Sequence, residues 1–318
     1  MEHSTVALIG PLDWAGSVGK ETSNTSFGIG ALKKDDRIVT TLYPSKYPEK
    51  IWSLLFPLSL ADEVFLNITA IDRYLGETII ALDLAGKKNG SIHISSSLDR
   101  SMLSGIIKGT VVEDYATFDP DPPVFRERLF TMLSREPEEE TMVIVDQAFN
   151  VKGVGTVVLG FVTRGEVKKH QELHALPVGK RTQVRSIQVH DRDQVTSPSG
   201  SRVGLALKNI EPEDIPRGTA LVSQPSSFKV SERVNARIRV SDHWKDDLSE
   251  GDRYHIWASL QFVPVIIRKV DGPSGGGPGN LTVEMETESR IWFHEGLGAG
   301  LSFLDSRSFR LFAAGETI

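Results

Sequence analysis

Cysteine is absent from the 318-residue chain, and this absence narrows the chemistry open to it. Without thiols the chain has no disulfide, no thiolate zinc site and no cysteine nucleophile. Serine, histidine and aspartate are scattered without a nucleophile elbow, so we expect no hydrolase site and no catalytic residues. We also expect no metal site, because the eight histidines would have to build it without thiolates.

Long apolar runs and an excess of positive charge are missing as well. No segment approaches the roughly 20 apolar residues that a membrane-spanning helix needs. The start, MEHSTVALIG, is a polar tip followed by a strand pattern and not a secretion signal. We therefore expect a cytoplasmic protein without a membrane partner. The formal net charge of −6 disfavours DNA binding and non-specific nucleic-acid coating, which need strongly basic proteins.

One group of basic residues nevertheless stands close together in the sequence. Its members are Lys168, Lys169, His170, Lys180, Arg181 and Arg185. Two interpretations remain open: the group is a solvated rim, or it faces RNA, since phosphate contacts need only local positive charge.

The first 140 residues alternate between strand and helix patterns. The segments TVALIG, RIVTTLY, EVFLNIT and SIHIS are apolar and often β-branched, which predicts strands. The segments YPEKIWSLLFPLSLA, YLGETIIALDLAG and PPVFRERLFTML have helical spacing. This alternation predicts an α/β domain with an open, mainly parallel sheet.

The rest of the chain reads as short strands with turn residues between them, which is typical of small β-barrels. Gly153 and Gly155 suit positive φ in a tight or bulged turn. The charged segment SREPEEET at 134–141 predicts an exposed linker, and GPSGGGPGN at 272–280 predicts a flexible hairpin loop. LTVEMET and ESRIWFHE predict two further strands, and Pro264 fits only an edge or a bulge.

Two motifs carry a resemblance to a known family. The pattern F-x-V-x-G-x-G-T-V-V-x-G-x-V-x-R-G, followed by V-R-S-I-Q and R-V-G-L-A-L, resembles the second domain of EF-Tu-type translational GTPases and is most similar to SelB. G-x-x-Y-H-x-x-x-S-L-Q-F-V-P is similar to the third domain of SelB. The resemblance implies a GTPase-like α/β domain at 1–140, an EF-Tu domain 2-like β-barrel at 141–225 and a domain 3-like β-barrel at 226–318. SelB proteins carry a fourth domain, for which we expect no counterpart here.

The first domain departs from the family's phosphate-binding loop, G-x-x-x-x-G-K-[ST]. Gly19 and Lys20 are present, but Trp14 replaces the first glycine and Glu21 replaces the magnesium-binding hydroxyl. A carboxylate beside a triphosphate adds repulsion. We therefore treat Gly19 and Lys20 as nucleotide-binding remnants at most.

The other GTPase motifs are also altered. No D-x-P-G-H follows RIVTTLY, and Ser96-Ser97-Leu98-Asp99 takes the place of the guanine-reading N-K-x-D. Asp99 is a third candidate remnant of nucleotide binding. The stretch between Lys20 and the strand at 37 is too short for the large first switch. These losses imply a degenerate GTPase domain that does not hydrolyse GTP, with GTP and magnesium disfavoured as ligands.

The resemblance also implies a pocket for the aminoacylated end of tRNA, on the barrel face that looks toward the first domain. The residues in corresponding strands and loops are Asp146, Phe149, Arg181, Arg185, His190 and Arg202. Arg181 is the strongest candidate, because a basic group suits an RNA end or an anionic amino acid. Phe149 is also suited to the barrel core, and the others to solvated turns and strand edges.

Three functional hypotheses follow. The first is a translation elongation factor-like protein that binds aminoacyl-tRNA or the ribosome without GTP hydrolysis. The second is an unconventional GTPase in which Gly19 and Lys20 still hold nucleotide. The third is a regulatory protein that contacts only protein partners.

Overall fold

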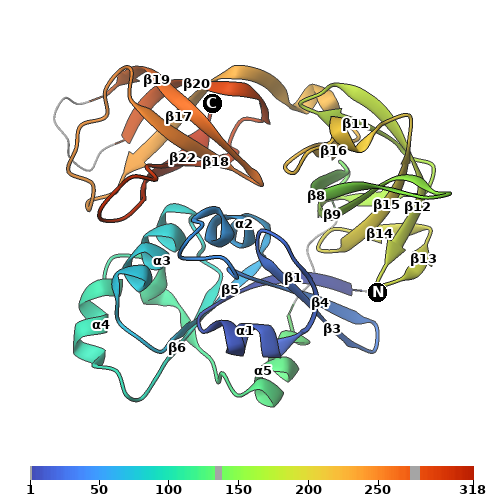
Figure 1. The fold of residues 1–318 in the computed structure, drawn as a ribbon. Helices are drawn as coiled ribbons and strands as arrows, with labels where there is room; N and C mark the ends of the chain where they lie inside the picture. Colours follow the sequence, from blue (N-terminus) through green and yellow to red (C-terminus); the bar gives the residue numbers. More distant parts are fainter. Residues whose placement is uncertain (1, 133–137, 273–279) are drawn as a thin grey trace.

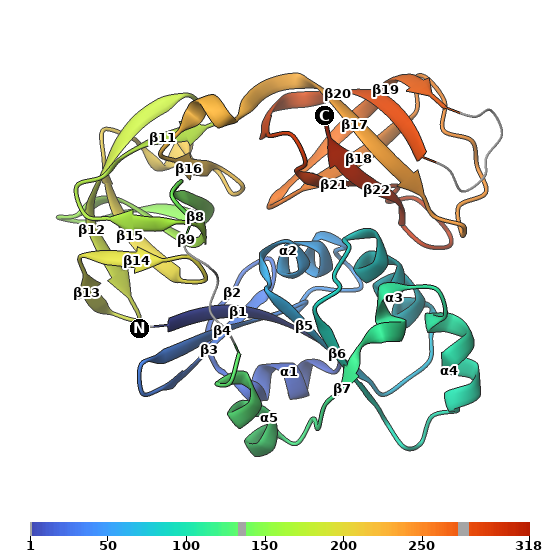
Figure 2. The same cartoon turned by 180° about the vertical axis from the view of Figure 1, so that it is seen from behind.

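The computed structural model describes residues 2–132, 138–272 and 280–318. An N-terminal α/β domain lies below two β-barrels in Figure 1, and the three units surround a common centre. In the view from behind, the first barrel lies above the N-terminus and the second barrel lies above helices α2 (Trp52–Leu60) and α3 (Arg73–Leu84) (Figure 2). This is the predicted fold class, an α/β domain followed by two barrels.

The N-terminal domain is built on one mixed sheet with the order β2-β3-β4-β1-β5-β6-β7. Its strands are β1 (Glu2–Ile9), β2 (Lys20–Asn24), β3 (Gly28–Lys34), β4 (Arg37–Tyr43), β5 (Glu63–Ile68), β6 (Gly90–Ile94) and β7 (Ala116–Thr117). All neighbours from β4 to β7 pair in parallel, whereas β2 and β3 are antiparallel. The expectation of a mainly parallel sheet is confirmed.

Helices cover both faces of this sheet, because successive strand residues point to opposite sides. The remaining helical elements are α1 (Leu12–Val18), α4 (Arg100–Ile107), α5 (Pro122–Leu129) and the 3₁₀ turn η1 (Val111–Asp114). Ala7 and Ile9 of β1 pack with α2 and α3, while Val6 and Leu8 pack with α1 and α5. Helix α2 is buried on several sides, because Leu54, Leu55 and Leu58 pack in the cluster with β1 while Phe56 and Leu60 pack in a second cluster.

The hairpin formed by β2 and β3 was not predicted from the sequence. The segment Lys20–Asn24 reads KETSN, which is polar and has no apolar alternation. It becomes a strand by pairing with Gly28–Ala31 of β3 at the edge of the sheet. Tertiary pairing therefore outweighs local propensity at this edge.

The first barrel closes six strands in the order β11-β16-β8-β9-β15-β12, with β11 pairing back to β12. Its elements are β8 (Met142–Val151), β9 (Gly155–Arg164), β10 (Glu166–Lys168), β11 (Glu172–Leu176), β12 (Lys180–Val189), β13 (Arg192–Gln194), β14 (Thr196–Pro198), β15 (Arg202–Lys208), β16 (Ala220–Val222) and the 3₁₀ turn η2 (Pro212–Asp214). Gly153 and Gly155 have φ of 82° and 93° in the β8–β9 turn. The prediction of positive φ at both glycines is confirmed.

The second barrel is closed in the order β17-β20-β19-β18-β21-β22. Its elements are the 3₁₀ turn η3 (Pro225–Ser227), β17 (Lys229–Val240), β18 (Arg253–Ala258), β19 (Gln261–Asp271), β20 (Asn280–Phe293), β21 (Gly298–Ser302) and β22 (Leu311–Thr317). The prediction of two strands in 281–295 is wrong, because β20 is one strand that spans bulges in its pairing with β17 and β19. Pro264 of β19 pairs with His255 of β18. On its other side, the pairing of β19 with β20 begins only at Val265, so the missing N–H of Pro264 is tolerated.

Two predicted connections fall largely outside the described residues. They are the charged linker at 134–141, of which 133–137 are not described, and the glycine-rich loop at 272–280, of which 273–279 are not described. In the described part of the chain, none of the helices is both long enough and apolar enough to cross a bilayer.

The three units share one buried cluster of apolar side chains, which we call the shared core. Its buried members are Phe27, Ile29, Leu42, Phe56 and Leu60 from the N-terminal domain; Met142, Ile144, Phe161, Leu176, Ala220 and Val222 from the first barrel; and Leu260 and Trp292 from the second barrel. Trp292 is fully buried, and its Nε1 donates to the carbonyl of Gly218 at 2.6 Å. A core that crosses all three units opposes independent domain motion, because separation would expose it to water.

Candidate functional site at the domain junction

The face of the first barrel that looks toward the N-terminal domain is built around Asp146 of β8. Its side chain is fully buried. The Nε of Arg217 donates to its Oδ1 at 3.1 Å, and the Nη2 of Arg202 lies 3.7 Å from its Oδ2. A buried carboxylate requires such partners, because taking an unpaired charge out of water is costly.

The same two arginines bind the unpredicted β2–β3 hairpin. Arg202 Nη1 donates to the hydroxyl of Thr22 at 3.1 Å. Arg217 donates to the hydroxyls of Thr25 at 3.2 Å and Ser26 at 2.5 Å. The region where the resemblance implied an aminoacyl pocket therefore holds a hairpin of the chain itself, and Asp146 and Arg202 are engaged there in an interface between domains.

The other four predicted pocket residues lie on the outside of the first barrel. Phe149 is 39% exposed, and Arg181, Arg185 and His190 are exposed. Partial burial and the positive charges of Lys33 and Arg202 lower the pKa of His190. The structure thus separates the six predicted residues into two that are engaged between the domains, Asp146 and Arg202, and four that lie on the outside of the barrel.

Two of the exposed residues, Arg181 and Arg185, belong to one basic face. They alternate along β12 with the buried residues Thr182 and Val184, so they point outward on either side of Gln183. Gln183 donates to the carbonyl of His170 at 3.2 Å and accepts from Lys208 Nζ at 3.0 Å. We call His170, Arg181, Arg185 and Lys208 the basic face.

The predicted nucleotide remnants do not form a phosphate cradle. Only Gly10 and Pro11 separate β1 from α1, and a Cβ on Gly10 would lie 2.7 Å from the carbonyl oxygen of Asn67. Gly19 and Lys20 stand at the far end of α1, where Lys20 begins the edge strand β2. In a phosphate-binding loop these two residues open the helix, so that its backbone amides surround phosphate.

Asp99 and Glu21 have local structural partners. Asp99 Oδ1 accepts the backbone N–H groups of Ser101 and Met102, so it caps α4. Glu21 accepts a hydrogen bond from the Tyr43 hydroxyl.

Lys20 and Asp99 are far apart in the sheet. Lys20 begins β2 and Asp99 follows β6, and five strand spacings, or about 24 Å, separate β2 from β6. The structure therefore does not bring Lys20 and Asp99 together.

An aromatic cleft of about 570 Å³ lies beside the shared core, and all three units contribute to it. The residues that define it are Trp52, Arg217, His255, Phe262 and Arg290. Phe262 lies against Trp52 at 5.6 Å between ring centroids, and His255 stacks on Phe262 at 5.0 Å with the rings 14° apart. The cleft thus combines partly exposed rings with the guanidinium group of Arg290, whereas that of Arg217 is engaged by Asp146, Thr25 and Ser26.

This combination suits an unpaired nucleotide. Bases stack on aromatic rings, and guanidinium groups bind phosphate through paired N–H donors. The sequence did not predict the cleft. Trp52 lies in a predicted helix and His255 and Phe262 lie in predicted strands, and no local pattern shows that these elements meet. The aromatic residues inside the Y-H-x-x-x-S-L-Q-F-V-P motif were the available signal.

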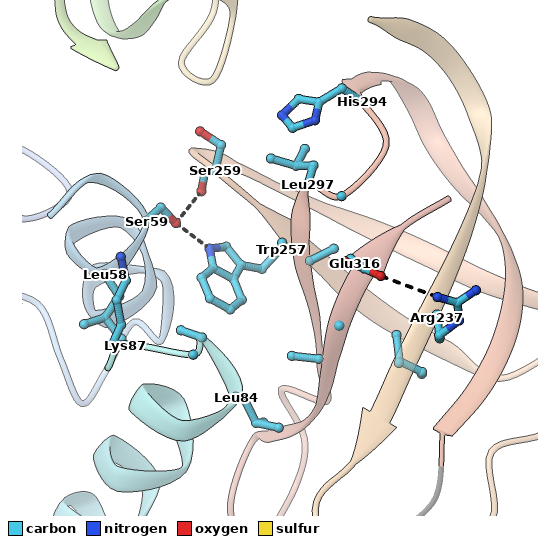
Figure 3. Close-up of a pocket in the computed structure, with 18 of the residues that line it drawn as sticks. Leu58, Ser59, Leu84, Lys87, Arg237, Trp257, Ser259, His294, Leu297 and Glu316 are labelled. Carbon is cyan, nitrogen blue, oxygen red and sulfur yellow. Dashed lines mark hydrogen bonds and ion pairs between the residues drawn. The ribbon is translucent and has the colours of Figure 1, made fainter. Parts of the chain in front are cut away.

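The N-terminal domain is also fixed to the second barrel. Glu77 of α3 is buried and accepts from Arg310 Nε at 3.1 Å, from Arg310 Nη2 at 2.5 Å and from the Tyr47 hydroxyl at 3.0 Å. Burial and the charge of Glu77 raise the pKa of Tyr47. The Nε1 of Trp257 donates to the Ser59 hydroxyl at 2.9 Å, which donates to the carbonyl of Ser259 (Figure 3).

No group of three or more histidine, aspartate or glutamate side chains gathers as metal ligands among the residues that the structure describes. His170 and His174 have the i, i+4 spacing of helical zinc ligands. That spacing joins two ligands only on a helix, and Glu172–Leu176 form strand β11.

Comparison with known proteins agrees with this architecture. The family model "Elongation factor Tu domain 2" matches residues 155–222. The chain is 33% identical over 273 residues to the "Uncharacterized protein MJ0325" of Methanocaldococcus jannaschii, covering 85% of this chain and 88% of that protein. It is 37% identical over 123 residues to the selenocysteine-specific elongation factor of the same organism, covering 39% of this chain and 26% of that factor.

Solved structures show the same fold. SelB from Methanococcus maripaludis, in complex with the GTP analogue GPPNHP, matches with a TM-score of 0.81 at 20% identity, covering 100% of this chain and 79% of that one. The fold and the matched barrel together define a translation elongation factor-like protein. Within that class, the chain belongs to the SelB-like family that includes the Methanocaldococcus jannaschii protein MJ0325.

Proposed function

We propose that this protein binds an RNA of the translation apparatus, aminoacyl-tRNA or the ribosome, without hydrolysing GTP. The aromatic cleft is the observation that carries the proposal, because it offers partly exposed rings and the guanidinium group of Arg290 where the three units meet. The basic face of the first barrel is a second surface suited to phosphate. Such a role belongs in the cytoplasm, as the composition of the chain led us to expect.

The absence of a GTP-driven switch is part of the proposal. The two-residue turn after β1 leaves no room for a phosphate loop, and Gly19 and Lys20 stand at the wrong end of α1. The Asp146 network and the shared core join the N-terminal domain to both barrels. A switch must release such contacts in one of its states, which a buried ion pair and a common core oppose.

Nucleotide titration by calorimetry tests this part. We expect no guanine-selective, magnesium-dependent binding when the full chain is titrated with GTP, GDP and ATP in turn. A micromolar Kd for GTP, about −8 kcal/mol, with much weaker binding of ATP would overturn it and favour the unconventional GTPase.

RNA binding is tested with two variants in the second barrel. Arg290 lines the aromatic cleft, whereas Arg253 of β18 is exposed and is not among the residues that line it. Fluorescence anisotropy with an aminoacyl-tRNA should show about tenfold weaker binding for Arg290→Gln, the loss of a charge-assisted contact to phosphate. Arg253→Gln should bind like the unaltered chain.

The basic face separates RNA binding from the regulatory alternative. Replacing Arg181 and Arg185 by glutamine should lower RNA affinity and flatten its salt dependence, since fewer counterions are released. If neither these changes nor Arg290→Gln alters RNA affinity, the protein-only regulatory hypothesis is favoured.

A further inference from the structure

The exposed large apolar side chains in the described part of the N-terminal domain share one position in the fold. They are Leu12, Tyr74, Met102 and Val124, which are 44%, 37%, 58% and 53% exposed. Each lies in the first turn of a helix, and the four helices are α1, α3, α4 and α5. One exposed apolar side chain is ordinary, but several that gather in one place mark a surface for a partner.

The topology of the sheet brings these four first turns together. Helix α1 follows β1, α3 follows β5, α4 follows β6 and α5 follows β7, and these four strands are parallel neighbours. All four helices therefore begin at the carboxyl edge of the sheet. Three strand spacings, or about 14 Å, separate β1 from β7. We call Leu12, Tyr74, Met102 and Val124 the apolar edge.

The apolar edge takes no part in the cores of the described residues. None of its four side chains belongs to a buried apolar cluster there. In Figure 2, α1, α4 and α5 lie below α2 and α3, on the side away from both barrels. Covering the edge would remove apolar surface from water, and the distance from the barrels leaves it open to another molecule.

The helices that carry Leu12 and Val124 form a fixed platform. Trp14 Nε1 of α1 donates to the carbonyl of Pro120 at 3.0 Å, and its ring lies 5.6 Å from that of Phe125 in α5. At the other end of α1, Arg126 Nε of α5 donates to the carbonyl of Val18 at 2.8 Å. A surface held in this way binds without first being ordered.

The side of the apolar edge formed by α1 and α5 is acidic. Asp13, Asp119 and Asp121 are exposed there. Asp119 Oδ1 accepts the backbone N–H of Asp121 at 2.9 Å, and the Asp121 side chain makes no capping hydrogen bond to α5. Arg126 does not offset these acids, because its guanidinium binds the far end of α1.

The side formed by α3 and α4 is close to neutral. Arg73 lies over the ring of Tyr74 at 5.0 Å. The charged residues in the caps and first turns of this side are Asp72, Arg73, Asp99 and Arg100, and the loop after β4 adds Lys46, Glu49 and Lys50. Four bases thus face three acids here, against three acids on the α1–α5 side. The apolar edge as a whole is therefore acidic.

We propose that the apolar edge docks a segment of another protein that carries lysine or arginine beside apolar side chains. Electrostatic complementarity selects a basic partner. A phosphate backbone would be repelled by the acids, so the proposal is separate from RNA binding at the aromatic cleft. A second copy of the chain is disfavoured, because in a two-fold dimer the same acidic surface would meet itself.

Three labelled synthetic peptides test the proposal by fluorescence anisotropy with the full chain. The first has leucine and lysine at helical spacing, the second has glutamate in place of lysine, and the third has serine in place of leucine. We expect the leucine–lysine peptide to bind at least about tenfold more tightly than the other two, and less tightly at high salt. Equal binding of the glutamate peptide, or no binding of the leucine–lysine peptide at about 100 μM protein, overturns the proposal.

An apolar pair of variants locates the site. Leu12→Ser combined with Val124→Ser should weaken binding of the leucine–lysine peptide about tenfold, because two apolar contacts are lost. Val178→Ser combined with Val195→Ser is the matched control, since these valines are 43% and 71% exposed on the first barrel. Equal effects of the two double variants overturn the assignment of the site.

A charged pair of variants tests the acidic side. Asp13→Asn combined with Asp121→Asn should weaken binding about fivefold and flatten its salt dependence. Asp246→Asn combined with Asp247→Asn, at exposed acids of the second barrel, should do neither. If the salt dependence is the same in both double variants, the acids of the apolar edge do not select the partner.

Sedimentation equilibrium of the unaltered chain tests the second copy as occupant. We expect a monomer at about 100 μM. A dimer that Leu12→Ser with Val124→Ser dissociates overturns the proposal in favour of self-association. Thermal melting checks that each variant folds. Met102→Ser, on α4, gives an independent reading of the apolar edge if the double variant does not fold.

Discussion

The N-terminal domain meets its two barrels in different ways. Its contact with the first barrel combines the shared core with a buried polar network, in which Asp146 and two arginines bind hydroxyls of the β2–β3 hairpin. Its contact with the second barrel extends the domain's own core, since Trp257 and Leu311 pack in the same cluster as α2 and α3. An ion pair between the buried Glu77 and the largely buried Arg310 accompanies that apolar contact.

The two kinds of contact play different parts in holding the domains together. Apolar packing contributes most of the free energy of domain association, but it tolerates small shifts because it has no direction. Hydrogen-bonded charges allow only one arrangement and are costly to break. A backbone contact adds to the precision of the first interface: Gly200 has φ of 84°, and a Cβ there would lie 2.7 Å from the carbonyl oxygen of His3.

The largest expected effect comes from breaking the ion pair of the second interface. Glu77→Ala leaves Arg310 buried without its carboxylate and should lower the free energy of unfolding by about 3–5 kcal/mol. Urea denaturation followed by tryptophan fluorescence measures it, with one transition expected because the units share a core. Glu127→Ala is the control, since its ion pair with Lys34 has the same 2.5 Å distance but is exposed. Equal losses in the two variants would contradict the role of burial.

The first interface should respond less to an isosteric change. Asp146→Asn keeps an acceptor for Arg217 but removes the negative charge, and we expect a loss of about 2–3 kcal/mol. Asp214→Asn, at an ion pair with the half-exposed Lys180, is the matched control. If Asp146→Asn unfolds at the same urea concentration as the unaltered chain, the network does not hold the hairpin.

His3 makes the first interface sensitive to acid. It is 3% exposed, and burial and nearby positive charges, including His190, lower its pKa from 6.5 to about 4. Below pH 6.5 the unfolded chain takes up a proton that the folded chain does not, so stability falls as the pH falls toward 4. From pH 7 to pH 5 the loss should be about 2 kcal/mol. His3→Phe should remove this part of the pH dependence, whereas His170→Phe, at an exposed site, should leave it.

The smallest effect is expected at the exposed edge of the second interface. Arg239 pairs with Asp83 at 2.6 Å, but its side chain is 50% exposed. Arg239→Gln should change the free energy of unfolding by less than about 1 kcal/mol. A larger loss of unfolding free energy would mean that charge also contributes strongly to the second interface, as it does to the first.

Much of the fold could be predicted from local patterns. The strands at Glu2–Ile9 and Arg37–Tyr43 and the turn at Gly153 and Gly155 follow from apolar, β-branched and glycine residues that act within a few positions. The hairpin strand Lys20–Asn24 could not, because its five residues are polar and become a strand only beside β3. The barrel motif likewise predicted the class of protein, since the residues of the motif are close together in the sequence.

The candidate site was less predictable. Asp146 and Arg202 were selected as charged residues in the right strands, but nothing local shows that a hairpin from residues 20–34 covers them. Trp52, His255 and Phe262 lie far apart in the sequence and became a cleft only in the folded chain. The proposal for RNA binding therefore rests on the structure, while the nucleotide and tRNA candidates came from motif positions.

The sequence by itself determined the kinds of domain in this protein, through short-range patterns and a consecutive barrel motif. Only the tertiary structure decided which residues form the contacts between those domains. Arg217 reaches Ser26, 191 residues earlier, and Arg310 reaches Glu77, 233 residues earlier. The physical reason is that propensity acts over a few residues, whereas burial of charge and apolar surface depends on which distant segments the folded chain brings into contact.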